Sequence, residues 1–280
     1  MSKKDLEKEI FRFCLYLEEN ERSSGTIEKY MRDLHAFLRF LGEDDLTKEG
    51  VKKWKESLLD EGYAVSTVNS MLTAINMFLD YIGMSEYRVR SLRRQKMIFI
   101  DEKKELTKTE YFRLLKAAES NGNRRLSLVM QTICSTGIRI SELQYITVQA
   151  VRTGRAEVRC KGKIRMIFLA HKLRKFLKEY CRQQGIKRGA VFVTKNGNVL
   201  DRSNIWREMK NLCEIAGVSH TKVFPHNLRH LFAKIFYSME KDIVKLADLL
   251  GHSSIETTRI YIKDSGLEHG RRIERLNLLL

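Results

Sequence analysis

Residues 225–230 read Pro-His-Asn-Leu-Arg-His, a stretch that combines the start of a helix with two side chains suited to phosphate chemistry. Proline is favoured at the first position of a helix, so we expect a helix over residues 226–238. His226 and Arg229 lie three positions apart and would therefore share one helix face. A guanidinium can hold two phosphate oxygens in a bidentate fork, and an imidazole can move a proton near neutral pH. The stretch thus indicates a site for a phosphodiester.

The chain downstream of this helix contains another histidine and a tyrosine at short spacing. We expect a helix over residues 242–250 with Gly251 as its C′ residue, and a short helix from Ser254 that carries Tyr261. His252 either caps the preceding helix, where the helix dipole favours it, or contributes to the phosphate site. Tyr261 is either a half-buried aromatic residue or part of that site.

A single arginine, Arg139, interrupts an otherwise apolar region upstream. It lies on an expected turn between a helix over residues 125–135 and another that starts at residue 141. A guanidinium is costly to bury alone, so Arg139 is expected to be either paired or functional. Glu142 could form a structural pair with it. Alternatively, Arg139 and Arg229 together could hold one phosphate.

The composition is that of a folded protein with a sizeable core. Hydrophobic residues make up 43% and charged residues 31% of the 280 residues, which fits one large or two ordinary domains. No apolar run approaches the roughly 18 residues of a membrane span, and the charged N-terminus lacks the apolar region of a signal peptide. The five cysteines are scattered without a CxxC pair, as in reduced cytosolic proteins. We therefore expect a cytoplasmic protein.

Positive charge is concentrated in one part of the chain. The formal net charge is +17 overall, −4 over residues 1–88 and +21 over residues 89–280. A solvated basic surface would have the same composition, but a basic domain of this kind most often binds a polyanion. The second part of the chain is therefore expected to contact nucleic acid.

Apolar residues in the first 88 positions recur at intervals of three and four, which predicts helices. The expected helices cover residues 6–17, 27–41, 46–59 and 66–82, the last with Ser66 as N-cap. Further along, a capping box at Thr107 and Glu110 opens a helix to about residue 119. The remaining expected elements are a hairpin with strands 156–160 and 164–169, a helix over 172–184, a strand over 191–193, a turn at 196–197, and a helix that Ser203 caps and that extends to about residue 216.

Five motifs occur in order along the chain. They are Thr-Gly-Ile-Arg-Ile-Ser-Glu-Leu (136–143), Lys-Gly-Lys (161–163) in the hairpin, His-Asn-Leu-Arg-His (226–230), Leu-Gly-His-Ser-Ser (250–254) and Thr-Thr-x-x-Tyr (257–261). Together they resemble the tyrosine recombinase (integrase) family, in its compact Xer-like form. The resemblance covers essentially the whole chain, because residues 26–30 and 66–69 are similar to the family's N-terminal core-binding helices.

The resemblance implies a fold that is mainly α with a small β-sheet. Residues 1–88 would form an all-helical core-binding (SAM-like) DNA-binding domain, residues 89–105 a basic linker, and residues 106–280 a mixed α/β catalytic domain. The implied activity is site-specific DNA recombination, by strand cleavage and rejoining through a 3′-phosphotyrosine, without metal, ATP or other cofactor. Integration, excision, inversion and dimer resolution all remain open.

The resemblance also assigns roles to the catalytic residues. Tyr261 would attack the scissile phosphate, with His226 as its general base, since a phenol with a pKa near 10 needs help at neutral pH. Arg139 and Arg229 would stabilise charge on the non-bridging oxygens, and His252 would donate a further hydrogen bond. Glu142 would orient these side chains.

The general acid for the leaving 5′-oxygen would be a lysine on the hairpin. Two candidates occur, Lys161 and Lys163, and the turn is one residue shorter than in the family. Lys161 is preferred because it would end the first strand, and Lys163 stays open.

The expected partner is double-stranded DNA with inverted-repeat half-sites. The implied assembly is a homotetramer on two sites, in which the C-terminal tail at residues 275–280 is exchanged between subunits; folding back onto its own domain is the alternative. Such a protein would be cytoplasmic and nucleoid-associated. The candidate DNA contacts are Thr26, Lys29, Asn69, Arg90, Arg93, Arg94 and Lys96.

Three other functions fit parts of the pattern. A metal hydrolase could use His226 and His230 at a known ligand spacing, but Asn227 stands where the glutamate of HExxH would be, and an arginine in the same turn would repel a dication. His230 is otherwise expected to be structural. A non-catalytic DNA-binding protein would be expected to have lost one of the six catalytic positions. A type IB topoisomerase shares the phosphotyrosine chemistry but does not pair two sites.

Overall fold

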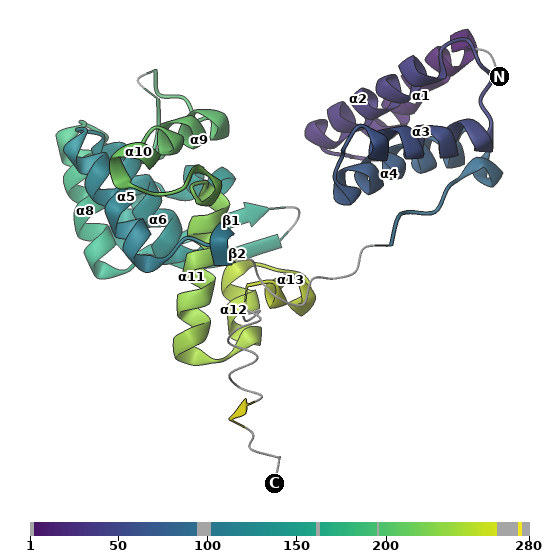
Figure 1. Ribbon diagram of the computed structural model, residues 1–280. Coiled ribbons are helices and arrows are strands. Elements are labelled where there is room, and N and C mark those ends of the chain that lie inside the picture. Colours follow the sequence, from purple (N-terminus) through teal and green to yellow (C-terminus); the bar gives the residue numbers. More distant parts are fainter. Residues whose placement is uncertain (1–2, 94–101, 161–162, 195, 262–273, 276–280) are drawn as a thin grey trace. The chain divides into compact units, whose positions relative to one another are not determined.

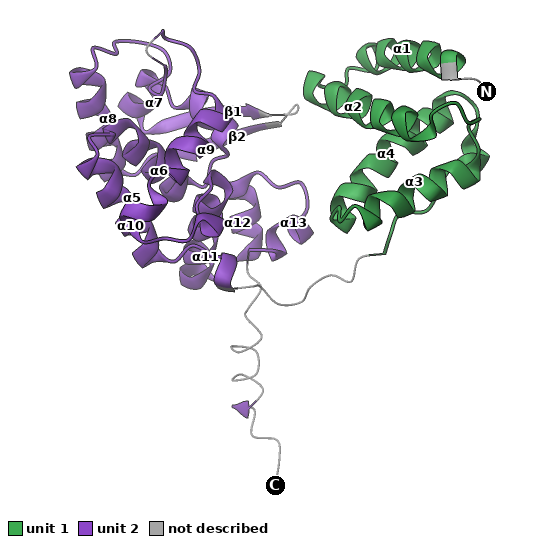
Figure 2. Ribbon diagram, turned by 45° about the horizontal axis from the view of Figure 1, so that its top comes forward, with its two compact units in different colours: residues 1–96 green, residues 97–280 purple. Residues whose placement is uncertain are grey.

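The computed structural model describes residues 3–93, 102–160, 163–194, 196–261 and 274–275. The chain divides into two compact units, Met1–Lys96 and Met97–Leu280 (Figure 2). The described residues contain no helix that is long and apolar enough to cross a membrane. The fold is mainly α-helical with one two-stranded sheet, as the sequence predicts.

The first unit is a bundle of four helices around one core (Figure 1). The helices are α1 (Lys3–Glu19), α2 (Ser24–Leu41), α3 (Lys48–Asp60) and α4 (Val65–Tyr81), followed by the 3-10 turn η1 (Ser85–Tyr87). Phe13 and Phe78 meet edge to face with 5.5 Å between ring centroids, and both are buried. The expectation that Ser66 is the N-cap of the fourth helix is wrong, because Ala64 is the last extended residue and Ser66 lies within the first turn.

Two asparagines on α4 hold the chain that leaves the bundle. Asn76 exchanges two hydrogen bonds with the backbone of Val89, at 2.9 and 3.1 Å. Asn69 does the same with the backbone of Leu92, at 2.9 and 2.7 Å. The two asparagines are seven residues apart and thus occupy one face of the helix. The first residues of the expected linker are therefore fixed to the first unit.

The second unit contains nine helices and the hairpin among its described residues. Its helices are α5 (Lys108–Ser120), α6 (Arg124–Thr136), α7 (Val148–Thr153), α8 (His171–Gln183), α9 (Arg202–Lys210), α10 (Cys213–Ala216), α11 (Pro225–Glu240), α12 (Ile243–Leu250) and α13 (Ile255–Arg259). Short 3-10 turns are η2 (Glu102–Lys104), η3 (Ile140–Tyr145) and η4 (His220–Lys222). α6 packs along α11 in the middle of the unit (Figure 1), and both bonds of the predicted capping box open α5.

The hairpin consists of β1 (Arg155–Cys160) and β2 (Lys163–Phe168), paired antiparallel from Arg155 opposite Phe168 to Cys160 opposite Lys163. Ala156, Val158 and Ile167 are buried on its inner face. Because alternate residues of a strand share a face, Arg165 lies on the same inner side.

Three expected elements differ from the structure. The helix expected from residue 141 is the 3-10 turn η3, which begins at Ile140. The expected helix at 203–216 is two helices, α9 and α10, and its cap is Asp201, whose carboxylate accepts hydrogen bonds from the Ser203 and Asn204 amides at 2.8 and 3.1 Å. The expected strand at 191–193 is absent from the described residues, where this region makes only single bridges at Ala190 and Val193. Val191 and Phe192 are buried in the core, and this burial accounts for the apolar run without a strand.

Gly137 ends α6 with a φ of 67°, and a Cβ atom there would lie 2.6 Å from Cε1 of Phe232 on α11. Gly137→Ala should therefore lower the free energy of unfolding by about 3 kcal/mol, because positive φ disfavours alanine and overpacking adds to the loss. Urea denaturation followed by circular dichroism measures this. Gly122→Ala is the matched control, since Gly122 has a φ of 68° but nothing within 4 Å. Equal losses in both variants would refute the close approach.

Candidate active site

Arg229 lies at the centre of the candidate site, on the buried face of α11, and only 1% of it is exposed. Its Nη1 donates a hydrogen bond to the Gly137 carbonyl oxygen at 2.6 Å, and its Nη2 donates to the Leu250 carbonyl oxygen at 2.7 Å. These carbonyls belong to the C-terminal ends of α6 and α12, where helices leave acceptors unsatisfied and carry partial negative charge. One guanidinium thus joins the ends of two helices.

The charge of Arg229 is not balanced by a carboxylate within the described part of the chain. Among the same described residues, Arg229 Nε is a buried donor that has no hydrogen-bond partner. Burial, and then the charge of Arg139, lower the Arg229 pKa to about 10, while the interaction with Tyr261 opposes this shift. The side chain therefore remains a buried cation at neutral pH, with an unused donor, which suits it to binding an anion.

Arg139 directly precedes η3 and pairs with Glu142, as one of the two sequence interpretations predicts. Its backbone N–H donates to Glu142 Oε2 at 2.7 Å, and its Nη1 donates to Oε1 at 3.1 Å. The Glu142 side chain is only 2% exposed, whereas that of Arg139 is 38% exposed. Burial is the largest cause of the lowered pKa values of His226, Arg229 and His252, and the charge of Arg139 lowers all three further. The structural pair therefore does not remove Arg139 from the site.

Arg165 is a charged residue near the site that the sequence interpretation missed. Its Nη2 pairs with Glu142 Oε2 at 2.5 Å, and its Nη1 donates to the Leu249 carbonyl oxygen. The buried carboxylate of Glu142 is thus enclosed by two guanidiniums and one backbone amide. The alternation of β2 could have indicated this residue, because Arg165 is a charged residue at a position that should face inward.

Glu142→Gln should destabilise the protein by about 3 kcal/mol, because removing one charge of a buried network leaves its partners uncompensated. Urea denaturation measures this loss. Glu157→Gln provides a control, because Glu157 forms a 2.8 Å pair with Arg159 in which the side chains are 44% and 72% exposed. The control should cost less than about 1 kcal/mol. Similar losses would mean that the Glu142 network contributes no more than a surface pair.

Tyr261 lies against three histidines. Its ring centroid is 6.1 Å from that of His226, 4.3 Å from that of His230 and 5.5 Å from that of His252. The tyrosine ring stacks on the His252 ring, with an angle of 14° between the two ring planes. The tyrosine is 3% exposed and belongs to a small apolar cluster with Leu250 and neighbours on α11 and α12. His230, which was expected to be structural, is in direct contact with Tyr261.

His252 is held at both ring nitrogens. Its Nε2 lies 2.9 Å from Arg229 Nη2, and its Nδ1 lies 2.9 Å from Thr258 Oγ1. A guanidinium only donates hydrogen bonds, so Nε2 must be the acceptor and Nδ1 carries the proton. The expected donation from His252 to a phosphate therefore requires these contacts to change.

The three histidines are held in the neutral form. Burial, followed by the Arg229 and Arg139 charges, lowers the His226 pKa. Burial also lowers the pKa values of His230 and His252 to about 4, with neighbouring cations adding to the shift. A neutral imidazole can accept a proton, as a general base must.

The side chains of several expected site residues are not among those that the structure describes. Lys161, Arg94, Lys96 and the tail at 276–280 lie outside the described residues, and Lys163 is described only as the first residue of β2. Within the described residues, no group of three or more His, Cys, Asp or Glu residues could hold a metal ion.

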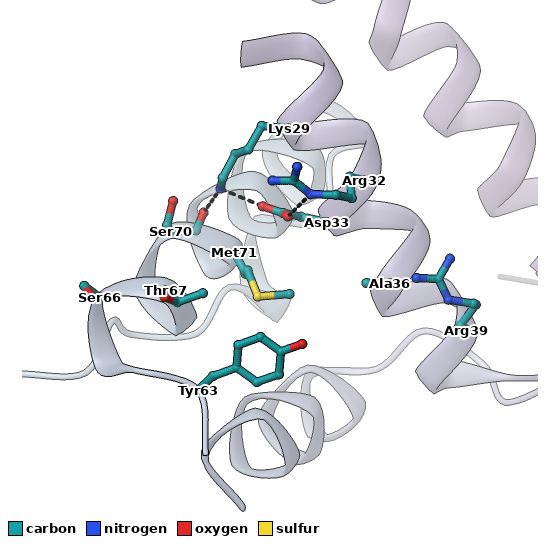
Figure 3. A pocket seen from close by; sticks show the side chains of 10 residues that line it. All are labelled: Lys29, Arg32, Asp33, Ala36, Arg39, Tyr63, Ser66, Thr67, Ser70 and Met71. Atoms are coloured by element: carbon teal, nitrogen blue, oxygen red, sulfur yellow. Dashed lines mark hydrogen bonds and ion pairs between the residues drawn. The ribbon is translucent and has the colours of Figure 1, made fainter. Parts of the chain in front are cut away.

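The first unit has a groove of about 560 Å³ between α2 and the start of α4, shown in Figure 3. It is lined by Lys29, Arg32, Asp33, Ala36, Arg39, Tyr63, Ser66, Thr67, Ser70 and Met71. Lys29 lies 2.6 Å from both the buried Asp33 Oδ2 and the Ser70 carbonyl oxygen, so it joins the two helices. The Arg32 side chain is 73% exposed.

The other expected DNA contacts differ in how free they are. The Asn69 amide is occupied by the Leu92 backbone, and Thr26 forms a 2.8 Å hydrogen bond with Ser23. Arg90 and Arg93 are exposed. Among the expected contacts that the structure describes, Arg90 and Arg93 are thus the exposed cations, and Arg32 adds an exposed cation to the groove, with its Nε 3.8 Å from Asp33 Oδ1.

The chain was compared with known families and proteins. The sequence pattern of the phage integrase family matches residues 104–267, and that of the phage integrase N-terminal SAM-like domain matches residues 10–83. Tyrosine recombinase XerA of Pyrococcus furiosus is 28% identical, with 100% of this chain and 98% of the relative covered. Tyrosine recombinase XerC of Roseiflexus castenholzii is 29% identical, with 87% and 84% covered.

Solved structures show the same fold. A lambda integrase tetramer bound to a Holliday junction has a TM-score of 0.75 at 18% identity, covering 91% of this chain and 76% of the other. The XerH recombinase bound to its difH substrate has a TM-score of 0.70 at 20% identity, covering 98% and 84%. The family pattern matches more than half of the residues, and the matched part contains the site of two arginines, three histidines and one tyrosine. This chain therefore belongs to the phage integrase family of tyrosine recombinases.

Proposed function

We propose that this protein is a site-specific DNA recombinase that cleaves and rejoins strands through a 3′-phosphotyrosine at Tyr261. The observation that carries the proposal is a buried, uncompensated guanidinium at Arg229 beside a tyrosine that packs against three neutral imidazoles. An anion completes the charge balance of such a site, and the tyrosine is the nucleophile at hand.

The residues divide the work of one strand transfer. Tyr261 gives its phenolic proton to His226 as its oxygen attacks phosphorus, and the bond from phosphorus to the 5′-oxygen breaks. Arg139 and Arg229 stabilise the added negative charge on the non-bridging oxygens. Glu142 and Arg165 hold Arg139 in place. The 5′-oxygen takes a proton from Lys161 or Lys163, and the reverse reaction joins a different 5′-end.

The phosphotyrosine keeps the energy of the phosphodiester bond, so the proposed cycle uses neither ATP nor a metal ion. The 5′-hydroxyl of the incoming strand replaces the tyrosine at phosphorus, which restores both the enzyme and the DNA backbone.

The proposed substrate is double-stranded DNA with inverted half-sites, bound by both units. The net charge of +21 over residues 89–280 supports this. In the first unit the groove of Figure 3 presents Arg32 and Arg39, and Arg90, Arg93, Arg94 and Lys96 follow on the chain. Thr26, Lys29 and Asn69, which make local contacts, are proposed to shape this surface. We place the protein in the cytoplasm, associated with the nucleoid.

The proposed assembly is a tetramer on two DNA sites, joined by exchange of the tail at residues 275–280. The lambda integrase tetramer bound to a Holliday junction, which shares the fold, supports this assembly.

A covalent-capture experiment tests the function. The protein is incubated, with a chelator and without ATP, with a pool of nicked duplexes whose inverted half-sites are randomised. A short 5′-hydroxyl fragment dissociates after cleavage and traps the intermediate. We expect SDS-resistant adducts whose DNA 3′-phosphate is attached to Tyr261 by peptide mass spectrometry. No adduct with any duplex, or attachment at another residue, would refute the proposal.

The general acid can be found with the duplex selected in that experiment. Lys161→Ala and Lys163→Ala are each compared on the ordinary duplex and on one with a 5′-thiolate leaving group, which leaves without protonation. Only the variant that lacks the acid should regain the wild-type adduct rate on the sulfur substrate. Rescue of neither variant would exclude both lysines.

A further inference from the structure

Thr258 connects His252 to the segment that carries the nucleophile. The residue is fully buried, and its Oγ1 lies 2.9 Å from His252 Nδ1. Its carbonyl oxygen accepts a hydrogen bond from the Tyr261 backbone N–H at 3.0 Å. Thr258 thus contacts one active-site side chain and supports the backbone of another.

The hydrogen bonds of the free site fix the polarity of the His252 ring. Its Nε2 accepts a hydrogen bond from Arg229 Nη2, so the single N–H of the neutral ring is on Nδ1 and donates to Thr258 Oγ1. In this state His252 cannot donate a hydrogen bond through Nε2. It satisfies the Arg229 donor that a phosphate oxygen would otherwise take.

We propose that Thr258 is a positioning residue that allows His252 to exchange one neutral tautomer for the other when a DNA phosphate enters the site. The phosphate oxygen then accepts from Arg229, the new Nε2–H of His252 donates to the phosphate, and the Thr258 hydroxyl turns to donate to Nδ1. This inference rests on the proposed function.

A hydroxyl is the group that this exchange needs, because it can accept a hydrogen bond in one state and donate one in the other. A carbonyl oxygen in its place would only accept, and it would hold the proton on Nδ1. The ring keeps one proton throughout: the Nδ1 proton leaves to water, and a proton from water binds Nε2. The charge of the imidazole ring therefore does not change.

The surroundings of the free site favour tautomer exchange over protonation. Burial, followed by the charges of Arg229, Arg139 and Arg165, lowers the pKa of His252 to about 4. An imidazolium would therefore be a fourth cation in one partly buried site. The neutral exchange supplies an Nε2–H without that cost.

Nitrogen NMR of ring-labelled histidine tests the proposal without any change at Thr258. The His252 signals are identified by their loss in His252→Gln. We expect Nδ1 to be protonated in the free protein and Nε2 to be protonated when Tyr261→Phe is bound to the duplex selected by covalent capture. The same tautomer in both states would overturn the proposal. Failure of the proposed function would instead appear as a wild-type protein that forms no adduct.

Substitutions at Thr258 supply a second readout, the rate of adduct formation. Thr258→Val keeps the shape but leaves Nδ1 without a donor, and we expect a loss of about tenfold to a hundredfold. Thr258→Ser keeps the hydroxyl and should restore most of the rate. In a His252→Gln background, Thr258→Val should lose less than about threefold further. An equal loss in both backgrounds would mean that Thr258 acts only on the fold.

Discussion

Tyr261→Phe is expected to abolish adduct formation while DNA binding persists. The substitution removes one oxygen from a side chain that is 3% exposed, and the phenylalanine ring can keep its contacts with His230 and His252. The chemical step loses its nucleophile, so the rate should fall by more than about 10⁴-fold, in the range of other removed nucleophiles. Gel electrophoresis in SDS measures the adduct, and a gel shift measures binding.

Tyr237 is the control for this experiment, because it also packs against the small cluster that contains Tyr261. Tyr237→Phe should form adducts at close to the wild-type rate. An adduct that survives in Tyr261→Phe and disappears in Tyr237→Phe would place the nucleophile at Tyr237. Loss of DNA binding in Tyr261→Phe would instead show that the hydroxyl contributes to DNA binding before the chemical step.

Arg229→Lys should impair both folding and catalysis, although it conserves the charge. The guanidinium donates to two helix-end carbonyls and to His252, and an ammonium on a flexible stem cannot reproduce that planar geometry. We expect the free energy of unfolding to fall by about 2–4 kcal/mol, because buried acceptors lose their donors. The adduct rate should fall by at least about a hundredfold, as for the loss of an oxyanion donor. Urea denaturation and adduct kinetics measure the two effects.

Arg139→Lys separates the structural part from the catalytic part. The Arg139 side chain is 38% exposed, and a lysine there can still pair with Glu142. We therefore expect a catalytic loss with a change in stability of less than about 1 kcal/mol. If Arg229→Lys changed stability as little as Arg139→Lys, the bridge between the ends of α6 and α12 would not be important for the fold.

The sequence predicts those elements whose local signals agree. The helix expected at 226–238 is α11, and the one expected at 242–250 is α12 with Gly251 after it in the left-handed region. Proline, glycine and apolar periodicity all point the same way there. The stretch at 191–193 carries a single signal, apolar character, and burial explains that signal without a strand.

The candidate site was predicted as a set of residues, but not as a set of contacts. The motifs named Arg139, His226, Arg229, His252 and Tyr261, and the described structure brings the last four into contact with one another directly or through one neighbour. The charge of Arg139 adds to burial in lowering the pKa values of His226, Arg229 and His252. Their roles in catalysis stay predictions until the variants are measured.

Some contacts had no motif to indicate them. Arg165 reaches Glu142 from a strand that the sequence predicts only as part of a hairpin, and Thr258 reaches His252 from the next helix. Asn69, which resembles a residue of a DNA-binding helix, uses its side-chain amide to form two hydrogen bonds with the backbone of Leu92. In each case the partner is decided by which surfaces pack together.

The sequence by itself determined the helical elements, the basic character of the second part of the chain and the family to which it belongs, because caps, periodicity and motifs are written in neighbouring residues. Only the tertiary structure decided what surrounds Arg229. Its carbonyl partners are 92 and 21 residues away in the chain, and they reach it because α6, α11 and α12 pack together. A local pattern can place a guanidinium on the buried face of a helix, but the packing of distant helices determines which acceptors it meets.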